Sequence, residues 1–351
     1  MSLPLSRRAM LAVLASAPGR AAHAAAPQPG AGPTREMLAA WQSFRQDFLR
    51  PDGRVVDSGN QGVSHSEGQG WAMFCAERCA DRASFDLIWS WTRRVLARPG
   101  DHLLAWRFVP ESAPPVADGN NATDGDLFAA TALLLAARRW NHAPYAESGA
   151  AIAGDILRLL VRHVAGQAVL LPGAQGFEDA GSVTLNPSYY AFPVLAVLAR
   201  AVPDPIWLAI AEDGLALLRR ARFGAWGLPP DWVVLEREGG ALSLPERWPP
   251  RFSYDAVRVP LYLRWAGLRD EPALRAAAAF WRRPGQGAAP AWVDLRSNRT
   301  APYPASSGVQ ALAGWITEQG NRSSRDTQGD YYSSILKLMT RCAAASSPYA
   351  G

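Results

Sequence analysis

The chain has 351 residues, of which 48% are hydrophobic and 19% are charged, and its formal net charge is +5. These proportions are typical of a folded globular protein and exclude a disordered chain. The basic excess forms no run of Lys or Arg that could follow a phosphate backbone, so we expect no nucleic acid partner.

The first 24 residues are predicted to be a secretory signal peptide. Arg7 and Arg8 precede a short apolar run, Met10 to Ala17, and Ala22 to Ala24 offer a small-residue cleavage site. The paired arginines also fit a twin-arginine signal. Cleavage after residue 24 lowers the net charge from +5 to +2, because three arginines and no acid are lost. We therefore expect an exported protein, periplasmic or secreted, with residues 25–34 as a flexible leader and no membrane insertion after signal removal.

Residues 35–345 are predicted to form a single all-α domain. Apolar residues recur with helical spacing over 35–49, 66–80, 85–96, 123–140, 146–164, 187–201, 205–222, 254–266, 271–281, 306–319 and 331–345. Ser66 and Thr123 are the expected N-caps of their helices. Short extended segments are expected near 168–171 and 232–235.

The predicted helices alternate between two kinds. One kind is apolar nearly all round and starts from a polar, aromatic or acidic loop, as in SEGQGWAMFCA and ATDGDLFAATALLLAA. The other kind is amphipathic and carries Arg and Asp, as in SFDLIWSWTRRVLA. A helix that is apolar all round must be buried, and an amphipathic helix covers it. The alternation predicts an (α/α) barrel of two concentric helix layers, with the N-termini of the inner helices gathered at one end.

Acidic residues stand at the starts of the predicted inner helices. Glu67 begins the first of them and Asp255 the fourth, while Asp124 and Asp126 begin the second. Separate acids that converge at one mouth are costly to desolvate unless they have a function. The alternative is N-capping, which accounts for Asp124 and Asp126 as well as a functional role does. Arg258, one turn after Asp255, either steadies an acid of the site or forms a structural ion pair.

Aromatic residues in the connecting loops complete this constellation. Trp106 lies in LLAWRF and Trp232 in GLPPDWV. Tyr254 directly precedes Asp255, and Tyr189 stands at the start of the third inner helix. Aromatic faces offer flat apolar platforms for sugar rings. Beside carboxylates, and with no metal or phosphate motif in the sequence, they favour a carbohydrate ligand and call for no metal or other cofactor.

Five segments of the chain resemble glycoside hydrolase family 8: SEGQGWAM, ATDGDLFAATALL, LNPSYYAFP, GLPPDWV and YDAVRVPLY. The resemblance runs from about Trp41 to Leu338, nearly the whole chain after the leader. It implies an (α/α)6 barrel and an inverting mechanism. Matched residue by residue, Glu67 is the general acid, Asp255 is the general base, and Asp124 binds the sugar at the cleavage point.

The resemblance also narrows the substrate. An aspartate at position 255 favours the cellulase-like branch of the family, whereas Trp71 and Phe128 depart from its common residues at subsite positions. The implied protein is an endo-β-1,4-glucanase that acts on a cellulose chain, linked to bacterial cellulose synthesis, with the cellulose synthase and export complex as a further partner.

Two other functions stay open at this point. A non-hydrolytic glucan-binding protein that assists secretion could use the same aromatic residues, but it would not need the acid and base pair of Glu67 and Asp255. A hydrolase of the same family could instead act on xylan or chitosan. Chitosan would call for further acids to meet its amines, and the sequence shows no such cluster.

Overall fold

The computed structural model describes residues 32–283, 288–319 and 329–346. The predicted signal peptide, residues 1–24, and most of the predicted leader, residues 25–34, lie outside the described residues. Eleven α-helices occur in the described part of the chain: α2 (Arg35–Phe48), α3 (Ser66–Arg78), α4 (Arg82–Val95), α5 (Thr123–Trp140), α6 (Ala143–Leu160), α7 (Phe192–Ala201), α8 (Pro205–Arg220), α9 (Arg258–Trp265), α10 (Pro272–Trp281), α11 (Ser307–Thr317) and α12 (Tyr331–Ser346). None of these described helices has both the length and the apolar character needed to cross a membrane.

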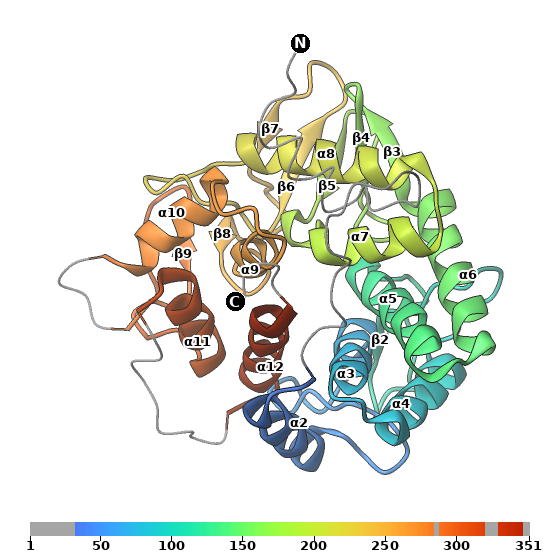
Figure 1. Ribbon diagram of the computed structural model, residues 1–351. Coiled ribbons are helices and arrows are strands. Elements are labelled where there is room, and N and C mark those ends of the chain that lie inside the picture. Colours follow the sequence, from blue (N-terminus) through green and yellow to red (C-terminus); the bar gives the residue numbers. More distant parts are fainter. Residues whose placement is uncertain (1–31, 284–287, 320–328, 347–351) are drawn as a thin grey trace, which may run out of the picture.

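Five helices that contact one another in sequence close a ring, which surrounds the centre of the molecule (Figure 1). α3 contacts α5, α5 contacts α7, α7 contacts α9, α9 contacts α12, and α12 returns to α3. Outside the ring, α4, α6, α8, α10 and α2 each pack against one of its helices, and α11 packs against α9, α10 and α12. Two concentric helix layers are the arrangement of an (α/α) barrel, so the predicted all-α barrel of inner and outer helices is confirmed.

The sequence explains why α3 and α5 lie inside and α4 outside. In α3, 11 of 13 residues are buried, and in α5 13 of 18, whereas α4 buries 5 of its 14 residues. Glycine stands where α3 and α5 cross. A Cβ at Gly125 would lie 2.2 Å from Ser66 Oγ and 2.7 Å from the Glu67 nitrogen. This glycine therefore lets the first turns of the two helices, with Glu67 and Asp124, lie side by side.

Short antiparallel strands build the connections between helices. In the described residues they are β1 (Ser64–His65), β2 (Arg107–Phe108), β3 (Val161–Val164), β4 (Gln167–Leu170), β5 (Ser182–Leu185), β6 (Val233–Glu236), β7 (Leu242–Ser243), β8 (Arg251–Phe252) and β9 (Val293–Asp294). They pair as β1–β2, β3–β4, β5–β6–β7 and β8–β9. β4 and β6 overlap the two predicted extended segments, near 168–171 and 232–235.

The predicted helix over 146–164 is wrong at its C-terminal end. α6 stops at Leu160, and Val161–Val164 instead pairs with Gln167–Leu170. The loop between the two strands is Ala165 and Gly166, both with positive φ (48° and 75°). Two central residues with positive φ match the twist of a tight hairpin, and valine suits a strand better than a helix end.

Two other predicted helices begin too early in the sequence because each contains a proline. The segment 187–201 starts with a separate 3-10 turn, and α7 begins only at Phe192, which places Pro193 in its first turn. The segment 254–266 likewise becomes α9 from Arg258, with Pro260 in the first turn. Proline lacks the N–H that a helix interior needs, and only the first turn can spare it.

The predicted N-caps Ser66 and Thr123 are also wrong. Each is the first residue of its helix, and the capping positions belong to His65 and Ala122, which make no side-chain cap bond. The Thr123 hydroxyl donates instead to the Leu171 carbonyl at 2.6 Å. The buried Ser66 hydroxyl has no hydrogen-bond partner among the residues that the structure describes.

Candidate active site

Three acids from three parts of the chain meet at one guanidinium group. Glu67 is the second residue of α3, Asp124 is the second residue of α5, and Asp255 lies in the turn before α9. Arg258 Nη1 contacts Glu67 Oε2 and, at 3.1 Å, Asp124 Oδ2. Its Nη2 contacts Asp255 Oδ1. The structure thus brings together four of the residues that the sequence singles out, and we call them the acid cluster.

The acid cluster carries more negative than positive charge. Arg258 is 2% exposed, so three carboxyl groups share one buried cation. Burial raises the pKa of Asp124 well above its usual value, and the charge of Glu67 adds to this effect. Burial also raises the pKa of Asp255, although Arg258 opposes the increase. Because like charges disfavour full ionisation, the cluster favours keeping a proton on one of its carboxyl groups.

Arg258 keeps its positive charge although it is buried. Burial alone would lower its pKa, but Glu67, Asp255 and Asp124 together outweigh burial and raise it well above the usual value. The guanidinium lies over two aromatic rings as well, 5.3 Å from the Trp71 centroid and 5.9 Å from that of Tyr189. Arg258 is therefore a fixed cation that orients the three acids.

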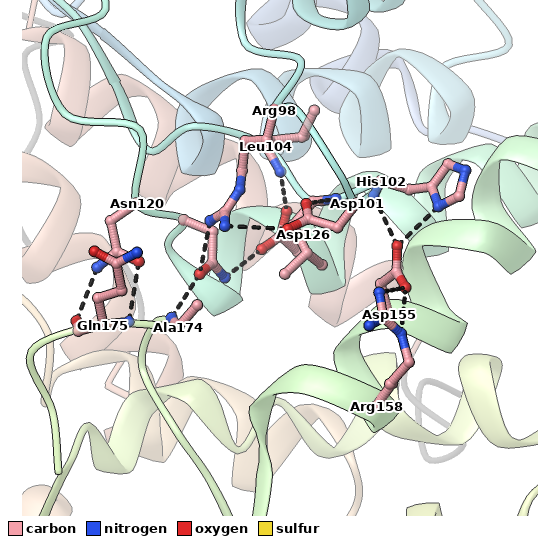
Figure 2. Close-up of polar contacts among 12 residues, drawn as sticks. Arg98, Asp101, His102, Leu104, Asn120, Asp126, Asp155, Arg158, Ala174 and Gln175 are labelled. Atoms are coloured by element: carbon pink, nitrogen blue, oxygen red, sulfur yellow. Dashed lines mark hydrogen bonds and ion pairs between the residues drawn. The ribbon is translucent and has the colours of Figure 1, made fainter.

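Asp126, the second acid of the TDGD segment, serves a different purpose. It is fully buried and accepts hydrogen bonds from the Leu104 nitrogen at 2.8 Å and from Asn121 Nδ2 at 2.7 Å (Figure 2). Burial raises its pKa to about 8. Asp124 Oδ1 accepts from the Gly125 nitrogen at 2.9 Å, in the first turn of its own helix, whereas Asp126 accepts from residues that precede the helix. Asp126 instead ties α5 to the loop that leads into Trp106.

Trp106 lies directly beside the start of α3. Its carbonyl oxygen accepts from the Ser66 nitrogen at 3.0 Å, and its own nitrogen donates to the Asn120 carbonyl at 2.9 Å. Trp106 Nε1 donates to Asp118 Oδ2 at 2.7 Å, which fixes the half-buried ring. Trp106, a predicted platform residue, is therefore hydrogen-bonded through its backbone to Ser66, which directly precedes Glu67.

Trp232 belongs to a stack of three aromatic rings. Its ring lies parallel to Trp248, with centroids 4.9 Å apart, and to Phe177 at 5.7 Å. Tyr189 lies next to the stack, 6.5 Å from Trp232, and is buried beneath Arg258. Sequence reasoning missed Trp248 and Phe177, although a loop tryptophan between Arg247 and two prolines was a usable signal for the first.

Tyr254 lies on the other side of Asp255 in the chain and is 57% exposed. Its carbonyl oxygen accepts a hydrogen bond from the Tyr332 hydroxyl at 2.5 Å, and the two rings meet edge to face at 5.5 Å. Tyr332 was not predicted, because it comes from α12 and reaches Tyr254 only through the closure of the ring. Aromatic residues thus adjoin the acid cluster through several different elements.

Comparison with known proteins agrees with this geometry. Residues 3–346 match the family described as glycosyl hydrolases family 8, and the chain belongs to this family. Among the described residues, no group of three or more His, Cys, Asp or Glu is placed to hold a metal ion.

Individual relatives are similar over most of their length. A probable endoglucanase of Novacetimonas hansenii is 45% identical over 318 residues, which cover 90% of this chain and 93% of the relative. An endoglucanase of Cellulomonas uda is 39% identical, over 78% of this chain and 76% of its own. The solved structure of the endo-beta-1,4-glucanase CMCax from Acetobacter xylinum superposes with a TM-score of 0.83 at 44% identity, covering 89% of this chain and 98% of that one.

Proposed function

We propose that this chain is an endo-β-1,4-glucanase that hydrolyses glucan of the cellulose type with inversion at the anomeric carbon. The acid cluster carries the proposal, because it holds a potential general acid, a potential general base and a sugar-binding carboxylate on one arginine. The relatives support the substrate, since those compared above are described as endoglucanases or as an endo-β-1,4-glucanase.

In this mechanism Glu67 gives its proton to the glycosidic oxygen as the bond to the anomeric carbon breaks. Asp255 takes a proton from a water molecule, and the water oxygen attacks that carbon from the opposite face of the sugar. Inversion needs carboxyl groups roughly 6.5–9.5 Å apart, which leaves room for this water. Asp124 accepts hydrogen bonds from hydroxyls of the sugar at the cleavage point, and Arg258 keeps all three acids in register.

The neighbouring aromatic residues bind the rest of the glucan chain. Trp106 and Trp232 stack on glucose rings, and Tyr189 and Tyr254 line the approach to the cleavage point. Such stacking uses the flat apolar faces of the β-linked sugar and tolerates long chains, which suits attack within a polymer.

The stereochemistry of the first product tests the proposal. Proton NMR of freshly cleaved cello-oligosaccharides should show the α-anomer first, and Asp255→Asn should abolish its formation. Glu67→Gln should be equally inactive, and both variants should still bind the oligosaccharide. An initial β-anomer would mean retention and a wrong base. Oligosaccharide binding without cleavage by the unmodified protein would favour the non-hydrolytic glucan-binding function instead.

The cellular setting is a second part of the proposal. Export across the membrane follows from the Arg7 and Arg8 segment with its apolar run, and a link to cellulose synthesis follows from the family branch. Fractionation of cells that express the full chain should place it in the periplasm or medium. If Arg7→Lys with Arg8→Lys traps it in the cytoplasm, the twin-arginine route is supported. A cytoplasmic wild-type protein would contradict export. Failure to co-purify with a cellulose synthase complex would contradict the link to cellulose synthesis.

A further inference from the structure

Asp231 is a buried carboxylate next to the acid cluster, and it has no part in the chemistry proposed above. It is 8% exposed and directly precedes Trp232. Its backbone nitrogen donates to the Arg251 carbonyl at 2.7 Å, which holds this segment against the strand that leads toward Asp255. A buried acid needs compensating donors, and the identity of these donors indicates its purpose.

Within the described part of the chain, the side-chain bonds of Asp231 go to two residues of the turn that carries Asp255, one before and one after that aspartate. Asp231 Oδ1 accepts from the Ser253 nitrogen at 3.0 Å and from the Ala256 nitrogen at 2.8 Å. Asp231 Oδ2 accepts from the Ser253 hydroxyl. Asp255 lies between these donors in the sequence, so one carboxylate fixes the backbone before and after it.

One other bond anchors this turn to a distant part of the chain, from the Tyr332 hydroxyl to the Tyr254 carbonyl at 2.5 Å. Within the turn, the Val257 nitrogen donates to the Ser253 carbonyl at 3.1 Å and the Arg258 nitrogen to the Asp255 carbonyl at 3.0 Å. These bonds close the turn on itself. Tyr332 holds it only before Asp255, whereas Asp231 holds it both before and after Asp255. The anchor has an electrostatic cost, because burial and then the charge of Asp255 raise the pKa of Asp231 to about 7. A neutral acceptor would hold the turn without this repulsion.

We propose that Asp231 is a positioning residue for the general base, and that it holds the Ser253–Ala256 turn so that the Asp255 carboxylate faces the attacking water. The inference rests on the proposed function, since it takes Asp255 as the base. A base that is misplaced by about 1 Å can lose on the order of 100-fold in rate, so a small shift of this turn is enough to impair catalysis.

The test compares kcat and KM on cello-oligosaccharides for three variants at temperatures where each is folded. Asp231→Ala should lower kcat about 10- to 100-fold and leave KM within about twofold, because the base acts in the transition state and not in substrate binding. Asp231→Asn should restore kcat to within about fivefold of wild type, because its Oδ1 can still accept from both nitrogens. Asp179→Asn is the matched control, since Asp179 also accepts from two backbone nitrogens and a serine hydroxyl, but in an exposed turn. It should leave kcat unchanged.

Two results would overturn the inference. Wild-type kcat in Asp231→Ala would show that the turn does not need this anchor. A raised KM with unchanged kcat would mean that Asp231 acts through Trp232 on sugar binding. If Asp231→Ala does not fold, Asp231→Glu displaces the acceptor by one methylene, and wild-type kcat there overturns the inference equally. Asp255→Asn separates this from the proposed function: if it stays active, the base assignment itself is wrong.

Discussion

Two buried clusters of arginine and carboxylate lie at opposite ends of α3 and differ in charge balance. At its N-terminal end, Arg258 alone faces Glu67, Asp124 and Asp255. At its C-terminal end, a single acid, Glu77, faces two arginines.

The second cluster has two arginines for one carboxylate, and we call it the Glu77 cluster. Glu77 is 1% exposed, its Oε1 accepts from Arg139 Nε at 2.6 Å, and its Oε2 contacts Arg78 Nε. Both arginines are partly exposed, at 27% and 37% of their side chains, so water shares in their solvation. A cavity of about 550 Å³ opens beside them, lined also by Leu135 and Arg138, and it lies away from the acid cluster.

The difference in charge balance indicates which of the two clusters is suited to proton transfer. A buried acid that contacts two cations has its charge compensated. Three acids with one cation are not compensated, and the pKa values of Asp124 and Asp255 rise above those of free carboxyls. Perturbed acids concentrate at sites that move protons, whereas compensated pairs are structural. Substitutions at the two clusters should therefore affect different quantities.

The largest effect is expected from Arg258→Met. The loss of this cation removes the group that orients all three acids, and kcat should fall about 100- to 1000-fold. Because Arg258 opposes the burial that raises the pKa of Asp255, that pKa should rise further. The base is active only when ionised, so the acidic limb of the kcat/KM profile should move to higher pH.

Arg139→Met is the matched control, since it removes one of the two cations that contact Glu77. It should leave both kcat and the pH profile unchanged. An unshifted acidic limb in Arg258→Met would mean that Arg258 does not govern the ionisation of Asp255, and the comparison between the clusters would lose its basis.

Glu77→Gln should show the converse behaviour. It leaves two arginines without their acid, but both reach solvent, so the free energy of unfolding should fall by about 1–3 kcal/mol and not by the larger cost of a fully buried pair. Chemical denaturation measures this change. Activity at low temperature should match wild type, and a loss of kcat in the folded variant would show that the two ends of α3 are coupled.

The sequence predicted the acid cluster because its members share one simple property. Glu67, Asp124, Asp255 and Arg258 all lie at or near the start of an apolar helix, and a ring of such helices gathers their starts. The late starts of α7 and α9 could also have been predicted, since Pro193 and Pro260 forbid a helix interior at those positions.

Other parts of the site depend on contacts that leave no local pattern. Asp231 finds its partners 22 and 25 residues away, and Tyr332 reaches Tyr254 across 78 residues. Asp126 resembled a helix cap because its actual donors, Leu104 and Asn121, lie in a loop whose path is set by the fold. Only the assembled ring decides such pairings.

Asp126→Asn tests a third type of buried acid, one whose hydrogen-bond donors are neutral groups. Its pKa of about 8 in the folded protein exceeds the usual value of an aspartate, so the folded state binds the proton more tightly than the unfolded state does. The free energy of unfolding should therefore decrease as pH rises from about 4 to about 8, and the variant should lack this contribution. The variant should also be less stable by about 1 kcal/mol or more, because the two donors bond to different oxygens of Asp126 and an amide offers only one oxygen. Denaturation curves at the two ends of this pH range measure both effects.

The smallest effect is expected from Arg139→Gln. This variant tests whether one arginine is enough to compensate Glu77. Arg78 still contacts Glu77 in this variant, and the guanidinium that is lost is 37% exposed, so the free energy of unfolding should change by less than about 1 kcal/mol. Adding Arg78→Gln should cost more than the two single changes together, because only then is a buried carboxylate left without a cation. Strict additivity in this cycle would show that the two arginines act on Glu77 independently and do not substitute for each other. The redundancy of two cations on one acid is what the acid cluster lacks, where a single arginine serves three carboxyl groups and no second cation contacts them among the described residues.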